Sequence, residues 1–220
     1  MSPVSLAPPL NTSHLEQLQP VDVVRWAAEQ HGADRLVVTA SFGDAVLVHV
    51  ANSAAPGIEI ALLDTQYLFA ETHWFAKQLV ERFDLNVSVL HPEVAPDDLW
   101  LTDPTECCRL RKVDPLQRAL DGKAVWITGL RRADSATRAT APVAAFDLAK
   151  QVLKVNPLAT LSDDDVALYE QLHDLPHHPL SDRGYPSIGC WPCTRPVAPG
   201  DDKRAGRWAD SAKTECGLHL

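Results

Sequence analysis

The sequence lacks a surplus of positive charge. Its 29 acidic residues outnumber 20 lysines and arginines, which gives a formal net charge of −9. Proteins that bind nucleic acids or anionic membranes through bulk electrostatics carry the opposite charge. We therefore expect neither partner, and any small anion that the protein binds must be held by a local cluster of cations.

Long apolar runs are also missing. No stretch approaches the roughly 18 apolar residues of a membrane-spanning helix, and the N-terminal segment has neither the basic start nor the apolar run of a secretory signal. We expect a cytoplasmic protein. Because disulfides are rare in that reducing compartment, the five cysteines predict metal ligands or reactive thiols.

Internal repeats and long low-complexity tracts are absent as well, and 220 residues suit one domain with a sizeable core. Short runs of branched aliphatic residues alternate with segments of helical periodicity. The expected strands are 34–40, 58–64, 86–91 and 123–129, and the expected helices are 13–30, broken near Pro20, a helix starting near Asp44, and 68–83. This alternation predicts an α/β fold with a largely parallel sheet flanked by helices.

The last part of the chain has a different composition. From about Val197 it is rich in glycine, alanine and charge, with weak periodicity. We expect residues 1–196 to form the α/β domain and residues 197–220 to form a mobile C-terminal tail.

Polar segments follow three of the predicted strands: "SFGD" at 41–44, "LDTQ" at 63–66 and "TGLRR" at 128–132. Ligands of parallel α/β sheets bind at the carboxyl ends of the strands. "SFGDA" opens a helix, and the N–H groups at a helix start suit a phosphate. An ordinary tight turn is the simpler interpretation of this segment. It lacks the G-K-[ST] ending of loops that transfer a γ-phosphate. Arg131, Arg132 and Arg138 follow the third strand and suit an anion.

Four of the cysteines form two pairs, Cys107 with Cys108 and Cys190 with Cys193. Two pairs predict a four-thiolate metal site, which is either structural zinc or an iron–sulfur cluster. Adjacent cysteines are awkward for zinc, so the spacing favours iron–sulfur. The cations that follow, Arg109, Arg111 and Lys112, would offset the charge of the cluster. A solvated helix face is the simpler interpretation for Arg109 and Arg111, whereas Lys112 could bridge the cluster and a substrate anion.

Cys216 is the odd thiol and stands four residues from the C-terminus. A lone cysteine in a tail is often incidental. Here Arg204, Arg207 and His219 stand on the same tail and could lower the pKa of the thiol and bind an anion once the tail folds over a site. The arrangement suits a nucleophile that another thiol regenerates.

These residues resemble those of a known family, the assimilatory adenylyl sulfate reductases, within the wider group of adenylyl and phosphoadenylyl sulfate reductases. The resemblance runs through "SFGD", "LDTQYLFAETH", "ECCRLRK", "WITGLRRADSATRA", "KVNPLATLSDDDV", "YPSIGCWPCTRPV", "RAGRW" and "KTECGLHL". The group is similar to the adenine-nucleotide α-hydrolase-like fold of ATP pyrophosphatases. Phe42 and Ala45 depart from the S-G-G-x-D-S loop of those enzymes, consistent with a nucleotide site that does not cleave ATP.

The resemblance implies a reaction. Cys216 attacks the sulfur of adenosine 5'-phosphosulfate, AMP leaves, and thioredoxin or a similar dithiol releases sulfite from a cysteine thiosulfonate, in sulfate assimilation and cysteine biosynthesis. It implies a [4Fe-4S] cluster on Cys107, Cys108, Cys190 and Cys193. It also implies a substrate site that comprises Ser41, Phe42, Gly43, Leu63, Lys112, Gly129, Arg131, Arg204, Arg207 and His219.

Two alternatives stay open. Relatives that use the 3'-phosphorylated substrate usually lack the four cluster cysteines, which favours the unphosphorylated one by association. A more remote alternative is a zinc-stabilised nucleotide-binding module in which Cys216 is incidental. The sequence does not determine the oligomeric state, and a homo-oligomer stays open.

Overall fold

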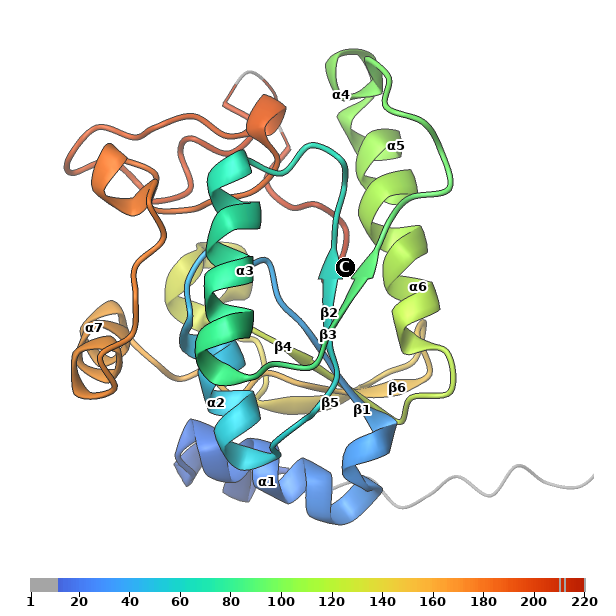
Figure 1. The fold of residues 1–220 in the computed structure, drawn as a ribbon, viewed down its shortest axis with the longest axis vertical. Coiled ribbons are helices and arrows are strands. Elements are labelled where there is room, and N and C mark those ends of the chain that lie inside the picture. The colour runs from blue at the N-terminus through green and yellow to red at the C-terminus, as the bar shows by residue number, and fades with distance from the viewer. Residues whose placement is uncertain (1–11, 210, 212, 220) are drawn as a thin grey trace, which may run out of the picture.

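A six-stranded sheet forms the centre of the molecule (Figure 1). The computed structural model describes residues 12–209, 211 and 213–219, so the predicted beginning of the domain at residues 1–11 lies outside them. The strand order is β3 (Val87–Leu90), β2 (Ile60–Leu63), β1 (Leu36–Thr39), β4 (Val125–Thr128), β6 (Val152–Val155) and β5 (Ala144–Asp147). All neighbouring pairs are parallel except β5 and β6. The predicted α/β fold is confirmed.

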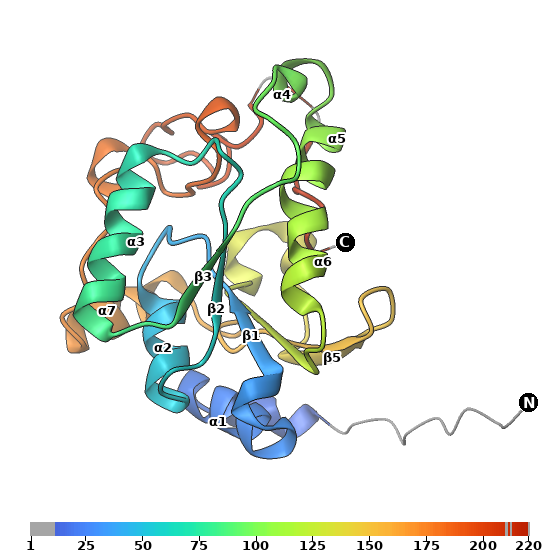
Figure 2. The ribbon, with the colours of Figure 1, turned by 45° about the vertical axis from the view of Figure 1, so that its right-hand side comes forward.

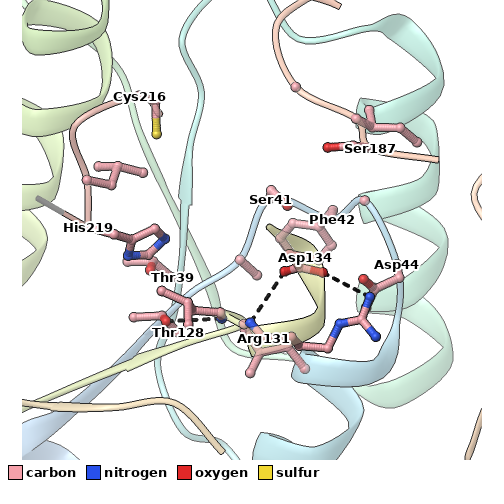
Figure 3. A pocket seen from close by; sticks show the side chains of 18 of the residues that line it. Thr39, Ser41, Phe42, Asp44, Thr128, Arg131, Asp134, Ser187, Cys216 and His219 are labelled. Atoms are coloured by element: carbon pink, nitrogen blue, oxygen red, sulfur yellow. Dashed lines mark hydrogen bonds and ion pairs between the residues drawn. The ribbon is translucent and has the colours of Figure 1, made fainter. Parts of the chain in front are cut away.

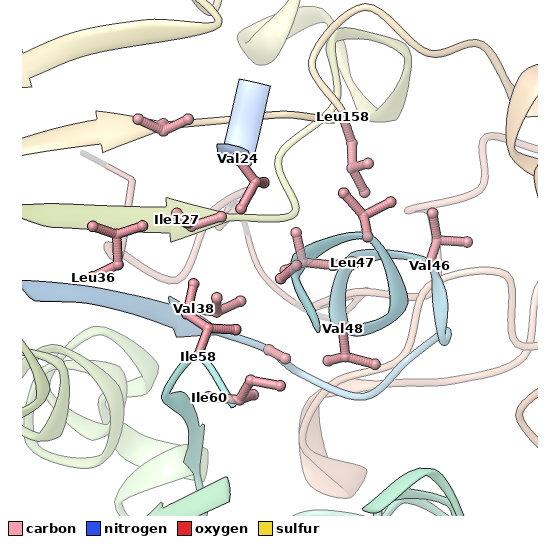
Figure 4. Close-up of a cluster of buried hydrophobic side chains, with 14 of the residues drawn as sticks. Val24, Leu36, Val38, Val46, Leu47, Val48, Ile58, Ile60, Ile127 and Leu158 are labelled. Carbon is pink, nitrogen blue, oxygen red and sulfur yellow. The ribbon is translucent and has the colours of Figure 1, made fainter. Parts of the chain in front are cut away.

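Helices cover both faces of the sheet (Figure 2). They are α1 (Pro20–His31), α2 (Val46–Ala54), α3 (Ala70–Phe83), α4 (Leu99–Thr102), α5 (Pro104–Cys108), α6 (Asp114–Leu120) and α7 (Asp163–Leu172). Alternate strand residues point to opposite faces. Val38, Ile60 and Ile127 therefore pack with α1 and α2 (Figure 4), whereas Val37 and Trp126 pack with α6 on the other face.

Strands β5 and β6 form an antiparallel hairpin that the sequence analysis missed. β5 lies at the edge of the sheet and exposes Ala145 and Phe146, and β6 carries the half-buried Lys154. Alanines form half of β5, and Lys154 interrupts the apolar residues of β6, and both residue types are depleted in strands. The pattern of branched aliphatic residues therefore indicated the other four strands and not these two.

A continuous helical column carries the first cysteine pair. Asp103 caps α5 by accepting hydrogen bonds from the backbone N–H groups of Thr105 and Glu106. After Cys108 the helix continues through one π-helical segment, Arg109–Val113, into α6. Such wider turns are frequent at functional sites because they re-aim the following side chains.

The C-terminal segment folds back onto the end of the sheet, between α3 and α5 (Figures 1 and 2). Arg207 bridges to Thr194, the backbone N–H of Trp208 donates to the carbonyl of Cys193 at 3.0 Å, and Trp208 is buried. The predicted tail boundary at Val197 therefore falls within a packed segment. The mobility of residues 197–220 stays a prediction.

Gly206 is the tightest position of this segment, because a Cβ atom there would overlap the carbonyl oxygen of Arg195 and contact Val197 at 3.0 Å. We expect Gly206→Ala to lower the free energy of unfolding by about 1 to 3 kcal/mol. Denaturant-induced unfolding followed by circular dichroism measures the change. Ala205→Ser adds one atom at the neighbouring exposed position and is the matched control. Equal stability of the two variants would contradict the packed segment.

No helix among the described residues has the length and apolar character needed to cross a membrane.

Candidate active site

The main pocket lies at the carboxyl ends of β1, β2 and β4, where the sequence predicted it. Figure 3 shows Cys216 and His219 entering from the tail on one side and Ser187 on the other. All eleven residues predicted to be catalytic or substrate-binding line this pocket: Ser41, Phe42, Gly43, Leu63, Lys112, Gly129, Arg131, Arg204, Arg207, Cys216 and His219. The fold therefore brings together residues that are far apart in the sequence, from Ser41 to His219.

The turn between β1 and α2 forms one wall of the pocket. Phe42 is buried and adopts a left-handed backbone conformation, with φ of 52°, so the chain reverses sharply there. The Asp44 carboxyl accepts the backbone N–H of Val46 at 2.9 Å at the start of α2, and burial raises the pKa of Asp44. A phosphate at this wall therefore needs the remaining N–H groups and nearby cations.

Gly129, at the end of β4, allows the opposite wall to approach closely. A Cβ atom at this position would lie 3.3 Å from Leu47 Cδ2, so a larger residue would push α2 away from the strand. The same wall continues into Arg131, whose guanidinium pairs with Asp134 at 3.0 Å and Asp163 at 2.9 Å.

The three arginines predicted after β4 have different positions. Arg131 and Arg138 line the pocket. Arg132 does not; it pairs with Glu16 at 2.7 Å and donates to the carbonyl of Ala141. The prediction that Arg132 serves an anion site is therefore wrong, because a distant carboxylate near the chain start already satisfies it.

Two cations of the pocket have no carboxylate partner among the described residues, Lys112 and Arg207. Arg207 instead donates to Ser187 Oγ and the carbonyl of Ile188, and its guanidinium lies over the Trp208 ring at 4.7 Å. Burial lowers the pKa of Lys112, whereas the nearby Cys190 and Cys216 raise it, and the net shift is upward. Lys112 therefore stays charged at neutral pH.

His219 lies flat against Trp126, with ring centroids 5.6 Å apart and planes within 14°. Burial, together with the cations Lys154, Arg138 and Lys150, lowers its pKa well below 6.5. A histidine with such a pKa is neutral at pH 7, so it brings no positive charge to the thiol or to an anion, and its predicted part in the substrate site stays a prediction. It lines the pocket as a neutral ring, and its Nδ1 atom is buried with no hydrogen-bond partner among the described residues.

Docking of the tail should therefore weaken in acid. An undocked His219 takes up a proton near its ordinary pKa of about 6.5, while the docked ring resists protonation, so docking loses up to about 1.4 kcal/mol per pH unit below that value. We expect faster backbone hydrogen exchange in residues 213–219 near pH 5.5 than near pH 7.5, after correction for intrinsic rates. His219→Phe keeps a flat ring that does not titrate and is the matched control. An equal pH response in both proteins would contradict the neutral docked imidazole.

The other four cysteines surround a second, smaller cavity next to the first. Cys107 and Cys108 come from α5, while Cys190 and Cys193 flank a short 3₁₀ turn. None is in a disulfide, and the Cys190 sulfur lies 3.2 Å from Thr65 Oγ1. Burial raises the pKa of both Cys107 and Cys108 to about 11. These thiols are therefore protonated unless a bound cation stabilises the thiolates.

Within residues 12–209, 211 and 213–219, no three His, Cys, Asp or Glu side chains lie close enough together to hold one metal ion. The Trp191 backbone N–H donates to the Tyr67 carbonyl at 2.8 Å and ties the C-x-x-C turn to the segment after β2.

The arginines near the first cysteine pair separate into two roles. Arg109 pairs with Glu106 and Asp114 on the surface, as expected for a solvated helix face. Arg111 is only 1% exposed; it lies 4.7 Å over the Tyr67 ring and pairs with Asp97 at 3.3 Å. The solvated-face interpretation is wrong for Arg111, because residues distant in sequence cover it.

Lys112 lies between the two cavities and lines both, as do Thr65, Arg207 and Trp208. The bridge that Lys112 was predicted to form between the cluster and a substrate anion stays a prediction. Thr65 and Trp208 were missed, although "LDTQ" and "RAGRW" had indicated their segments. Glu215 was also missed, and its place directly before Cys216 was the available signal.

Comparisons with known proteins agree with this geometry. Residues 35–196 match the family described as phosphoadenosine phosphosulfate reductase domain. Adenosine 5'-phosphosulfate reductase from Streptomyces coelicolor is 46% identical over 213 residues, which cover 93% of this chain and 90% of that protein. The solved structure of phosphoadenylyl-sulfate (PAPS) reductase from Candida auris, a phosphate complex, has a TM-score of 0.74 at 26% identity and covers 88% of this chain and 100% of that one. The NH3-dependent NAD synthetase from Campylobacter jejuni is similar in fold alone, with a TM-score of 0.52 at 11% identity over 76% of this chain and 75% of that one.

Proposed function

Because this chain belongs to the phosphoadenosine phosphosulfate reductase family, we propose that it is an oxidoreductase that reduces adenosine 5'-phosphosulfate to sulfite and AMP in sulfate assimilation. The observation that carries this proposal is the position of Cys216. The thiol lines the same pocket as the β1–α2 turn and the cations Lys112 and Arg207. A nucleophile, a turn at the start of a helix and anion-neutralising groups therefore share one pocket.

The reaction begins with the thiolate of Cys216, which attacks the sulfur atom of the phosphosulfate. A sulfur–sulfur bond forms, the bond between that sulfur and the bridging oxygen breaks, and its electron pair leaves with AMP. Cys216 then carries a thiosulfonate. Thioredoxin or a similar dithiol supplies two electrons, because one of its thiols attacks the Cys216 sulfur, sulfite leaves, and the second thiol regenerates Cys216 while the donor becomes a disulfide.

The free cations of the pocket neutralise the substrate. Lys112 and Arg207 have no carboxylate partner among the described residues, so they meet the oxygens of the phosphosulfate without first breaking an ion pair. Charge on the leaving phosphate grows as the bond breaks, and fixed cations stabilise it most in that state.

We infer a polynuclear cluster in preference to a single zinc ion from the two cysteine pairs and the adjacent positions of Cys107 and Cys108. The inference is supported by the second cavity, which all four thiols line. We therefore propose that Cys107, Cys108, Cys190 and Cys193 hold a [4Fe-4S] cluster. When bound, the cluster would join α5 to the C-x-x-C turn and place negative charge beside Lys112.

The same reaction on 3'-phosphoadenosine 5'-phosphosulfate is the second candidate, favoured by the similarity to the Candida auris enzyme. The four cysteines and the higher identity to the Streptomyces coelicolor protein favour the unphosphorylated substrate. A zinc-stabilised binding module has less support, because it leaves the pocket position of Cys216 unexplained. The need for a dithiol donor favours the cytoplasm.

The test is sulfite and AMP formation from each nucleotide, with and without reduced thioredoxin, by protein purified without oxygen. We expect sustained sulfite formation only with the dithiol, and a higher kcat/KM for adenosine 5'-phosphosulfate than for its 3'-phosphorylated analogue. A preference for the analogue would establish the second candidate. No sulfite from either nucleotide, by protein that retains its metal, would contradict the proposed function.

A further inference from the structure

Glu215, the residue directly before Cys216, is held by two arginines. Arg138 donates from Nε to Oε1 and from Nη2 to Oε2, both at 2.7 Å. Arg204 approaches Oε2 at 3.4 Å. The three side chains are only 10% to 14% exposed and all line the main pocket.

The contact has the geometry of an oxyanion site. Two parallel N–H groups of an arginine bind a carboxylate, a phosphate or a sulfate in the same way. Burial raises the pKa of Glu215, but the Arg138 hydrogen bonds lower it by more, so the net shift is downward and the carboxylate is ionised. Glu215 therefore fills a subsite that two arginines would otherwise offer to an anion in the pocket.

The same contact anchors the nucleophile. Among the described residues, Glu215 makes both ion pairs that hold residues 213–219 to the rest of the chain. The other polar tail contacts are the hydrogen bond from Arg204 Nη2 to the Thr214 carbonyl at 3.0 Å and the contact of Lys213 with Thr105 Oγ1 at 3.2 Å. Leu218 packs against the α6 face, and His219 stacks on Trp126. Loss of the Glu215 pairs would therefore remove the ion pairs that anchor the segment carrying Cys216 and loosen its docking.

We propose that Glu215 is a positioning residue whose carboxylate occupies an anion subsite, formed by Arg138 and Arg204, while the tail is docked. An anion that enters the subsite competes with Glu215 and releases Cys216. The inference rests on the proposed function only for the role of Cys216. In that reaction the competing anion is the sulfonate that forms on Cys216, the residue next to Glu215. The sulfonate displaces the Glu215 carboxylate from the two arginines, and the tail then undocks. The thiosulfonate of Cys216 thereby becomes accessible to the dithiol.

Inorganic sulfate is the probe, and the readout is alkylation of Cys216 by iodoacetamide in the metal-containing protein, followed by peptide mapping. The alkylation rate is compared at the pH where it no longer rises, because the thiol is then fully ionised and a change in its pKa does not affect the rate. Sulfate should raise the wild-type rate to a plateau, roughly fivefold or more above the rate without sulfate.

Glu215→Gln removes the charge and keeps the shape. It should react at the fast rate without sulfate, respond little to sulfate, and bind sulfate more tightly than the wild-type protein in a calorimetric titration. Asp201→Asn, at an exposed acid of the same segment that does not line the pocket, should behave as wild type. Arg138→Lys, which keeps the charge but loses the paired hydrogen bonds, should also react faster without sulfate.

Sulfate that slows the wild-type reaction or leaves it unchanged, or an unaltered sulfate affinity in Glu215→Gln, would overturn the inference. Failure of the proposed function is distinguishable. If adenosine 5'-phosphosulfate forms no adduct on Cys216, the sulfate response still decides the role of Glu215. If the sulfonate adduct forms on Cys216 and sulfate does not change the alkylation rate, only the inference about Glu215 fails.

Discussion

Cys216→Ser is expected to lose sulfite formation by at least about 10⁴-fold, as removal of an enzymatic nucleophile does elsewhere. The reason is that a serine hydroxyl is ionised far less than a thiol at neutral pH and cannot form the sulfur–sulfur bond. The thiol is half-buried and lines the pocket, and serine has nearly the same volume as cysteine, so the variant should fold. Sulfite release under saturating thioredoxin is the measurement.

The controls separate chemistry from structure. Thr214→Ser changes an exposed neighbour on the same segment and should keep wild-type activity. Cys216→Ser itself should keep the wild-type iron content and circular dichroism. If it forms sulfite at the wild-type rate, Cys216 is not the nucleophile, and the other four thiols become the candidates.

Cys190→Ser is expected to lose nearly all bound iron and to destabilise the wall between the two cavities. Cys190 is 9% exposed, contacts Thr65 Oγ1 and bridges to Leu68, so it links the C-x-x-C turn to the segment after β2. A serine oxygen is a poor ligand for iron beside three thiolates. The iron content, the visible absorption and the thermal unfolding temperature all report the loss.

Thr65→Val is the matched control for this position, because it removes the hydroxyl at 3.2 Å and leaves all four thiols in place. It should retain most of the iron. An unchanged iron content in Cys190→Ser would count against ligation by Cys190. Zinc in place of iron in the wild-type protein would overturn the cluster proposal itself.

The parts of the fold that the sequence predicted are those with a strong local signal. β1, β2 and β4 are buried on both faces and so read as short aliphatic runs, and the polar segments after them mark the pocket. The hairpin of β5 and β6 has a weaker signal, because the alanines of β5 and Lys154 of β6 interrupt the pattern of branched aliphatic residues.

In the site, residue types were predicted better than residue environments. The burial of Arg111 depends on Tyr67 and Asp97, and the partner of Arg132 is Glu16, more than 100 positions away. The neutral state of His219 depends on Trp126 and on lysines of the missed hairpin. Such properties arise from contacts between distant segments, which composition and spacing do not encode.

Intact mass shows whether Cys216 attacks the sulfur of adenosine 5'-phosphosulfate. The metal-containing protein is incubated with the nucleotide without any thiol reductant, and its mass is then measured and any adduct mapped by peptide digestion. We expect an added sulfonate on Cys216, released by reduced thioredoxin and absent from Cys216→Ser. An unmodified mass, or an adduct on any other cysteine, would contradict this mechanism.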